Sequence, residues 1–197
     1  MTKKHLDVVW EEQPDQIRRY YELLPSHERL SSEVEFHLKH LLKNAKMEYA
    51  HLSHRAKTLE SFCEKICRKN YKDPMTEITD LAGVRVVFLY TSDISIIKKI
   101  VEDSFVIIER VDKSDGQGAE RFGYNALHYL VKIKPEQVGI RLGDLHTLIC
   151  EVQIRTALQD AWALVAHHLS YKQELDIPKE LRRKLNALSG LFEAADD

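Results

Sequence analysis

The sequence lacks the glycine-rich patterns that most often hold nucleotide phosphates. It contains neither a G-x-x-x-x-G-K-[ST] loop nor a G-x-G-x-x-G turn, so chemistry of the P-loop and Rossmann kinds has no support. A Cys-x-x-Cys pair is also absent, and no Ser/His/Asp arrangement is recognisable by motif. The local patterning of charged and polar residues must therefore indicate the chemistry.

Cysteine is scarce, because Cys63, Cys67 and Cys150 are the only three in the chain. Their odd number argues against a disulfide framework. All three lie in patterns typical of buried helix or strand faces. We therefore interpret them as reduced thiols of the core.

Long apolar runs are missing too. No stretch approaches the roughly 18 apolar residues that cross a bilayer, so no membrane role is expected. No apolar segment of the signal-peptide kind follows the positive charges near Met1, so the expected location is cytoplasmic. The 197 residues, 44% hydrophobic and 30% charged, are typical of a globular protein, and the net charge of −2 neither demands nor excludes an anionic ligand.

Hydrophobic spacing predicts a helical amino-terminal region over residues 1–50, with a regular helix at 33–50 after a looser lead-in at 17–24. After it, strands alternate with helices, which is the pattern of an α/β or α+β sheet. The last two strands are expected to form an antiparallel pair. We expect strands at 52–57, 84–90, 105–111, 124–133 and 145–155, and helices from Thr58, at 94–101, at 157–171 and from Pro178.

A basic strip runs from the first expected strand onto the following helix. Arg55 and Lys57 alternate at period two and share one side of the strand. Ser61, Lys65 and Arg68 follow on one face of the helix, near its amino-terminal end, where backbone N–H groups favour an anion. The pattern indicates a polyphosphate site, although a solvated helix face carrying lysines has the same pattern.

The last two strands each have a polar side. Glu151, Gln153 and Arg155 alternate with apolar residues, as on a sheet that lines a cleft or faces water. Tyr124 and His128 share one side of the strand before it. An aromatic ring beside polar groups can stack on a base, and it can equally be packing.

Two acids complete the pattern. Asp80 precedes a glycine turn into the strand at 84–90, and Glu151 lies on the polar side of another strand. If these strands are neighbours, both carboxylates enter one cleft, where a pair of oxygen ligands beside phosphates suits Mg²⁺. Arg85, five residues after Asp80, would reach the nucleotide. Capping of a turn is the alternative role of Asp80.

Four segments in order carry a family resemblance: RAKTLESFCEK, DLAGVRVV, GYNALHYLV and EVQIRTALQDAWALVAHHLSYK. Together they resemble the synthetase domain of the RelA/SpoT alarmone synthetases, especially the small single-domain members. The resemblance covers about residues 50–195 and implies a synthetase domain over residues 51–197. It implies a nucleotidyltransferase-like mixed sheet of about five strands flanked by helices.

The resemblance also implies an activity. Members of this family transfer the β,γ-pyrophosphate of ATP to the 3′-hydroxyl of GDP or GTP and release AMP. On the donor side, it places adenine between Arg55 and Arg85. It assigns the ATP phosphates to Lys57, Ser61 and Lys65, Mg²⁺ to Asp80, and the role of second carboxylate, as base or metal support, to Glu151.

On the acceptor side, the resemblance implies that Tyr124 stacks on the acceptor base and His128 contacts an acceptor phosphate. Asn125, Gln153 and Arg155 accompany them. The sequence departs from the family here, because it reads GAERFGYNAL where members that use guanosine carry a lysine, a proline and an asparagine followed by GYRS. Ala166 and His168 replace the family's glutamate and lysine.

The departures leave the acceptor open. No His-Asp dipeptide occurs, so nothing indicates the hydrolase domain of longer members. A toxic branch of the family, which makes adenosine alarmones or modifies the 3′ end of tRNA, is the second hypothesis, and a silent nucleotide-binding domain is the third. A basic patch for tRNA could begin at Lys39, Lys43 and Lys46. A homo-oligomer also remains open.

Overall fold

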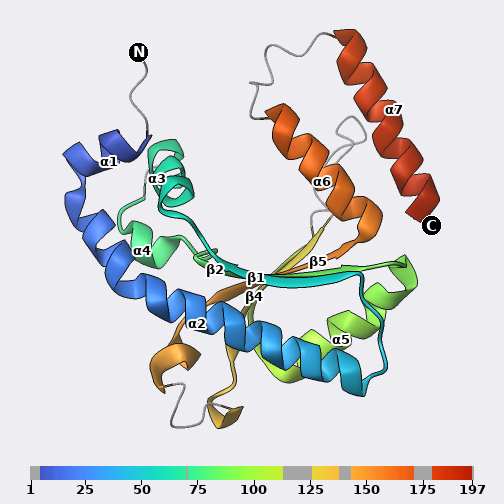
Figure 1. Cartoon of the computed structure of the whole chain (residues 1–197), viewed down its shortest axis with the longest axis horizontal. Helices are drawn as coiled ribbons and strands as arrows, with labels where there is room; N and C mark the ends of the chain where they lie inside the picture. Colours follow the sequence, from blue (N-terminus) through green and yellow to red (C-terminus); the bar gives the residue numbers. More distant parts are fainter. Residues whose placement is uncertain (1–4, 70, 113–125, 138–142, 171–178, 197) are drawn as a thin grey trace.

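A five-stranded mixed sheet forms the centre of the protein, as the family resemblance implies (Figure 1). The structure is a computed structural model that describes residues 5–69, 71–112, 126–137, 143–170 and 179–196. The strand order is β1-β2-β5-β4-β3. The strands are β1 (His51–Ala56), β2 (Ala82–Phe88), β3 (Phe105–Asp112), β4 (Leu127–Ile133) and β5 (Cys150–Thr156).

Strand pairing brings distant parts of the chain together. β2 and β5 are parallel neighbours, so Gly83 lies opposite Glu151 and Arg85 lies opposite Gln153. The other neighbouring pairs, β1 with β2, β4 with β5 and β3 with β4, are antiparallel. The antiparallel pairing expected for the last two strands is confirmed.

Helices cover both sides of the sheet. In Figure 1, α2 and α5 run below it, whereas α1 and α3 rise above one end and α6 and α7 above the other. The helices are α1 (His5–Glu12), α2 (Pro14–Asn44), α3 (Leu59–Arg68), α4 (Pro74–Glu77), α5 (Ile94–Ser104), α6 (Ala157–Ser170) and α7 (Lys179–Asp196), with 3-10 turns η1 (Thr91–Asp93), η2 (Pro135–Gln137) and η3 (Gly143–Thr147).

The main core lies between the sheet and the helices α2 and α5. Leu30, Val34 and Leu38 of α2 recur at helical spacing and are at most 1% exposed. They pack with the alternate strand residues that face them, including Val84 and Val152. Burying each such side chain contributes roughly 1.5–3 kcal/mol to folding stability. This face of the sheet therefore forms part of the core.

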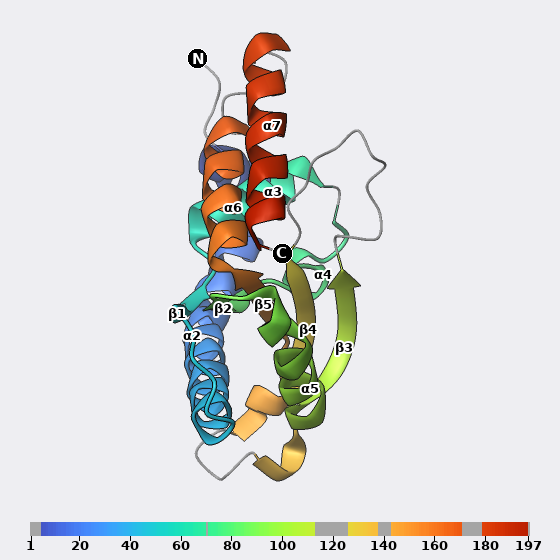
Figure 2. The ribbon, with the colours of Figure 1, turned by 90° about the vertical axis from the view of Figure 1, so that its right-hand side faces the viewer.

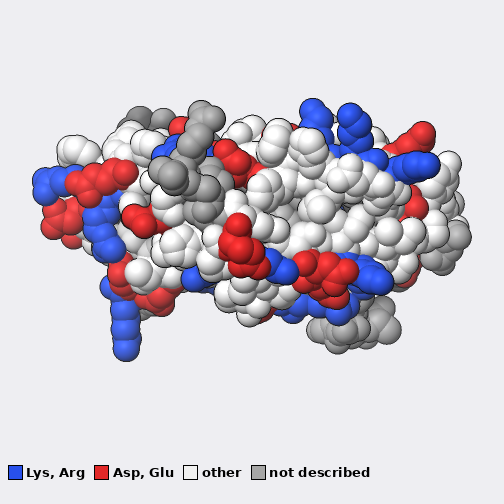
Figure 3. Space-filling view, turned by 90° about the horizontal axis from the view of Figure 1, so that it is seen from below, with Lys and Arg blue, Asp and Glu red and all other residues white. Residues whose placement is uncertain are grey.

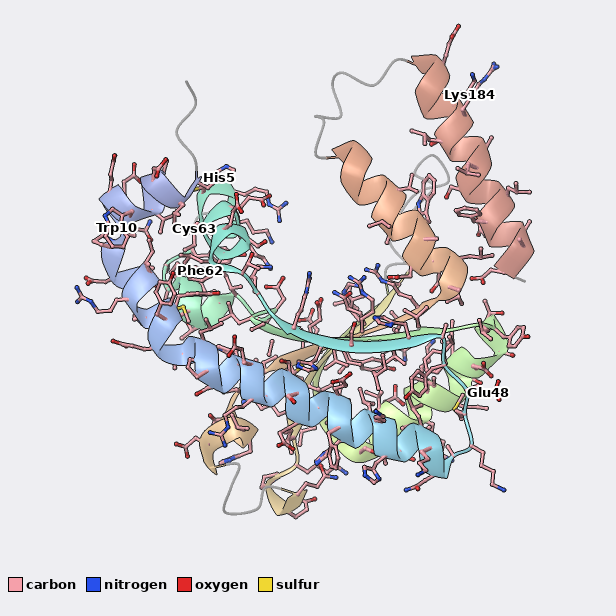
Figure 4. The ribbon with its side chains drawn as sticks, in the orientation of Figure 1. His5, Trp10, Glu48, Phe62, Cys63 and Lys184 are labelled. Atoms are coloured by element: carbon pink, nitrogen blue, oxygen red, sulfur yellow. The ribbon has the colours of Figure 1, made fainter. Side chains whose placement is uncertain are left out.

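A second, smaller core joins α1, α3 and the first half of α2. Phe62 and Cys63 of α3 are fully buried, and Figure 4 shows both on the side of α3 that faces α1 and α2. They pack with Ile17 and Tyr20 of α2. Thr58 is the N-cap of α3, as expected, because its Oγ1 accepts the N–H of Ser61 at 3.3 Å. These contacts fix α3 beside the end of β1.

The start of α6 is tied to the end of α7. Thr156 Oγ1 accepts the backbone N–H of Gln159 at 3.1 Å, and Gln159 Oε1 accepts the N–H of Thr156 at 2.9 Å, which is a capping box. The same hydroxyl donates to Asp196 Oδ2 at 2.5 Å. Figure 2 shows α6 and α7 standing together above the sheet. The first turn of α6 is therefore held from two directions.

Three expectations about the elements need correction. The expected helix at 33–50 is the second half of α2, which runs unbroken past Pro25 and ends at Asn44. It runs on because its two halves pack on the two cores. It ends where Lys46 has φ of 54°, and Met47 N–H bonds to Leu42 O at 3.0 Å, as in a Schellman motif.

The other two corrections concern strand starts. The strand expected from Leu145 begins only at Cys150, because residues 143–147 form the turn η3. Gly83 is not in a turn but inside β2, opposite Arg55 of β1. The turn before β2 is at Thr79 and Asp80.

The cysteines are free, but only two of them are core thiols. Cys63 and Cys150 are buried, and burial raises the pKa of Cys63 to about 11. Cys67 is exposed, so its assignment to the core is wrong. Among the described residues, no helix combines the length and the apolar character that spanning a membrane requires.

Candidate active site

The side of the sheet opposite α2 and α5 is polar. Along β5 and along residues 82–86 of β2, buried residues alternate with partly exposed ones, which include Arg85, Glu151, Gln153 and Arg155. The strand register aligns the polar positions in two rows across the sheet. One row is Arg55, Gly83 and Glu151, and the other is Ser53, Arg85, Gln153 and His128.

A pocket opens on this polar side at β1 and β2. It is lined by Ser53, Arg55, Gly83, Arg85 and Gln153, together with His54 and Val84. Because Gly83 has no side chain, the floor of the pocket between Arg55 and Glu151 consists of backbone only. A Cβ there would lie 3.8 Å from Glu151 O, an ordinary contact, so the protein's own packing does not demand glycine. The open floor instead suits a ligand that approaches the backbone.

Asp80 lies between two lysines. Its Oδ2 pairs with Lys57 Nζ at 3.0 Å and with Lys65 Nζ at 2.9 Å. The backbone places Lys57 there, because its N–H donates to Leu81 O at 2.8 Å. Burial alone would raise the pKa of Asp80, but the charges and hydrogen bonds of Lys57 and Lys65 outweigh burial and hold the pKa below its usual value.

Glu151 is held at both oxygens. His128 Nδ1 lies 2.9 Å from Oε1, and Gln153 Nε2 donates to Oε2 at 2.6 Å. Burial by itself would raise the pKa of Glu151. The hydrogen bonds from His128 and Gln153 and the charge of His128 outweigh burial, so the pKa of Glu151 lies below its usual value. The negative charge of Asp80 opposes this lowering, so the two carboxylates are close enough to interact. Both remain ionised at neutral pH.

Asp160, in the first turn of α6, is a site residue that the sequence analysis missed. Its Oδ1 pairs with Arg85 Nη1 at 3.1 Å and with Arg155 Nη1 at 3.3 Å. Burial and the nearby charge of Arg85 lower the pKa of Arg155, and Asp160 offsets part of that effect. The available signal was an acid five residues after Arg155, in the turn that begins the next helix.

Asp80 and Glu151 offer oxygen ligands of the kind that the predicted magnesium ion prefers. The structure describes no group of three or more His, Cys, Asp and Glu side chains that could hold a metal, so a metal here would need substrate oxygens as well. Mg²⁺ is commonly held in this way, by one or two carboxylates plus phosphates. Asp80 Oδ1 is buried and has no hydrogen-bond partner within the described residues, which leaves it free to bind a cation.

The structure brings most of the predicted site residues onto one side of the sheet. Ser61 lies on α3, where Thr58 Oγ1 donates to its hydroxyl at 3.0 Å. Tyr124 and Asn125 lie outside the described residues. The residues found together are Arg55, Lys57, Lys65, Asp80, Arg85, His128, Glu151, Gln153 and Arg155.

The basic patch predicted around α2 is not part of a continuous positive surface on the face that Figure 3 shows. Lys39, Lys43 and Lys46 are exposed. However, the face of the molecule seen from below, where α2 and α5 lie, carries both signs of charge among uncharged residues (Figure 3). Because positive and negative charges are mixed here, this face adds no support for a surface that binds nucleic acid.

Comparison with known proteins identifies the family of the chain. The sequence pattern of the region found in RelA / SpoT proteins matches residues 54–176. Two relatives from Bacillus subtilis (strain 168) are each 30% identical to the chain. The GTP pyrophosphokinase YjbM aligns over 73% of this chain and 66% of its own length, and the GTP pyrophosphokinase YwaC over 75% and 70%. The chain belongs to the RelA/SpoT family.

Solved structures confirm the fold. A GTP pyrophosphokinase family protein from Streptococcus pneumoniae superposes with a TM-score of 0.75 at 24% identity, covering 90% of this chain and 89% of that one. Small alarmone synthetase 1 from Bacillus subtilis gives 0.73 at 23% identity, with 90% and 92% covered. The same synthetase bound to its product pppGpp gives 0.71 at 21% identity, with 91% and 93% covered. The fold is that of the small alarmone synthetases.

Proposed function

We propose that this protein is a pyrophosphokinase that transfers the β,γ-pyrophosphate of ATP to the 3′-hydroxyl of GDP or GTP. The observation that carries the proposal is the shared polar side of β2 and β5. There, Asp80 with its two lysines lies near Glu151 with His128. The names of the two curated relatives support the same activity.

The donor ATP is assigned to the pocket at β1 and β2. Arg55 and Arg85 line it and offer flat guanidinium groups on which adenine can stack. The phosphates would then extend toward Lys57 and Lys65. Each ammonium group has three donors, so each can bind a phosphate oxygen while keeping its contact with Asp80. Ser61, beside the amino-terminal end of α3, adds a hydroxyl.

Magnesium is the proposed cofactor, held by Asp80 and supported by Glu151. When bound, it would neutralise charge on the transferred pyrophosphate, which is the main requirement of phosphoryl-type transfer. The buried, unpaired Asp80 Oδ1 is the protein atom that best fits this role. The lysines would keep Asp80 ionised and in place.

The acceptor is assigned to the side of Glu151 that carries His128. The acceptor 3′-oxygen attacks the β-phosphorus, the bond from that phosphorus to the oxygen bridging to the α-phosphate breaks, and AMP leaves. The hydroxyl proton passes to Glu151, or Glu151 supports the metal while water takes the proton. His128 Nε2 is buried and has no partner among the described residues, so it is available to an acceptor phosphate.

A labelling experiment tests the proposal. The protein is incubated with γ-labelled ATP, Mg²⁺ and, in separate reactions, GDP, GTP, AMP, ATP or deacylated tRNA. We expect GDP and GTP to take the label, and Glu151→Gln to prevent it. Label on AMP, ATP or tRNA instead would favour the toxic branch of the family. Nucleotide binding without labelling of any acceptor would favour a silent binding domain.

A further inference from the structure

Arg85 is held by two different side chains on the polar side of the sheet. Its Nε donates to Gln153 Oε1 at 3.3 Å, and its Nη1 pairs with Asp160 Oδ1 at 3.1 Å. Gln153 in turn donates to Glu151 at 2.6 Å. A continuous series of contacts therefore links the donor pocket to the proposed catalytic carboxylate.

Both contacts reach the edge of the guanidinium group. The N–H bonds of arginine lie in the plane of the group, so partners at its edge leave its two flat faces unobstructed. Arg85 also lines the pocket with Arg55, and its side chain remains 34% exposed. An arginine held in this way presents a fixed flat wall to a planar ligand.

The charges show why Asp160 is needed for this arrangement. Arg155 is largely buried, at 12% side-chain exposure, and its charge lies close enough to Arg85 to repel it. A single oxygen of Asp160 pairs with both arginines. Without that negative charge, two guanidinium groups would face each other in a partly desolvated site, where repulsion is stronger than in water. Arg85, the more exposed of the two, would be displaced.

The position of Asp160 is itself fixed. It lies four residues after Thr156, whose capping box with Gln159 begins α6 and whose hydroxyl also bonds to Asp196 at the end of α7. The carboxylate therefore projects from a helix turn held at several points. The contact between Asp160 and the two arginines is therefore supported by the fixed backbone of α6 as well as by the Asp160 side chain.

We propose that Asp160 is a positioning residue, which holds Arg85 as a flat wall of the donor pocket and so sets the affinity for the adenine base. The inference rests on the proposed function only in naming ATP as the ligand. The carboxylate of Asp160 pairs with Arg85 and Arg155. Its effect passes through Arg85.

The first test observes the arginine directly. In a ¹⁵N spectrum of the arginine Nε–H groups, the Arg85 signal is assigned by its loss in Arg85→Lys. We expect this Nε–H to exchange slowly with water in the wild type and faster in Asp160→Asn. Asp15→Asn is the matched control, because Asp15 pairs with Arg18 at 3.3 Å on the exposed surface of α2. A fast-exchanging Arg85 Nε–H in the wild type, or equal rates in Asp160→Asn, would overturn the proposal.

The second test measures ligand affinity by calorimetry with a non-hydrolysable ATP analogue and, separately, GDP. We expect Asp160→Asn to weaken the analogue by about fivefold, within the range of coupling in one ion-pair network, and to weaken GDP less, because Asp160 also pairs with Arg155 of the expected acceptor side. In an Arg85→Ala background, Asp160→Asn should add no further loss. A loss of GDP affinity as large as the loss for the analogue, or fully additive losses, would show that Asp160 acts other than through Arg85.

The two tests separate failure of the inference from failure of the proposed function. If the wild type binds no ATP analogue, the donor assignment is wrong, whereas the exchange rate of the Arg85 Nε–H still decides whether Asp160 holds that side chain. Melting temperatures of all variants are compared with that of Asp15→Asn. A loss of affinity without a loss of stability is the result that a purely structural role of Asp160 would not produce.

Discussion

The imidazole Nδ1 of His128 lies 2.9 Å from Oε1 of Glu151, and the two residues come from neighbouring antiparallel strands. Gln153 occupies the other oxygen of Glu151 at 2.6 Å. The carboxylate is thus oriented and kept ionised in a largely buried position. A charged group held in advance in this way can stabilise a transition state without further reorganisation.

Removal of either carboxylate charge is expected to abolish pyrophosphate transfer. Asp80→Asn and Glu151→Gln keep the side-chain shapes but remove charge from the site that we propose holds the metal and the developing charge. Initial rates are compared with those of Glu60→Gln, an exposed position on α3. Losses below about tenfold, or roughly 1.4 kcal/mol in barrier, would show that the metal site is misplaced.

Glu151 is expected to make folding stability depend on pH in the acid range. Its pKa is lowered in the folded protein from an ordinary value of 4.5, so its contribution is complete above about pH 4.5 and is lost as pH falls through the lowered pKa. Denaturant unfolding is measured at pH 7 and at several acid pH values. Glu151→Gln should be less stable than the wild type at pH 7, and the difference should narrow in acid. A constant difference would contradict the assignment of the pKa shift.

Arg55→Ala is expected to weaken binding of a non-hydrolysable ATP analogue and to leave acceptor binding unchanged. Arg55 lines the pocket assigned to the donor and lies opposite Gly83, away from His128. Calorimetry with both ligands tests this, with the exposed Arg18→Ala as control. Equal affinity of Arg55→Ala and the wild type for the analogue would move the donor site elsewhere.

Tyr124 is expected to stack on the acceptor base. Tyr124→Ala should then lose roughly 1–3 kcal/mol of acceptor binding, whereas Tyr124→Phe should retain most of it, because the aromatic face survives. The affinity for ATP should barely change in either variant. A destabilised Tyr124→Ala protein with equal losses for both ligands would instead indicate packing, since truncating a buried aromatic leaves a cavity.

Thr156→Ala is expected to destabilise the fold by about 1 kcal/mol or more, since it removes the N-cap of α6. The substitution also breaks the hydrogen bond to Asp196 that ties α7 to this turn. Thr156→Ser keeps the hydroxyl and is the matched control. Chemical denaturation compares the three proteins, and equal losses in the alanine and serine variants would show that the methyl group, not the cap, matters.

Much of the fold was predictable because it depends on local patterns. The alternation of polar and apolar residues in β5 reveals both of its faces, and Thr58 begins α3 because its side chain accepts a nearby backbone N–H. Element ends were less predictable. The end of α2 at Asn44, followed by the positive φ of Lys46, and the turn η3 depend on backbone conformations that the hydrophobic spacing does not encode.

The candidate site divides in the same way. By itself, the sequence determined which residue types lie on which side of each strand, and its four motifs indicated the family. Only the tertiary structure decided that Lys57 and Lys65 both reach Asp80, and that Asp160 lies between Arg85 and Arg155. The physical reason is strand order: Arg85 and Gln153 are 68 residues apart in the chain, and they touch only because β2 and β5 pair in parallel.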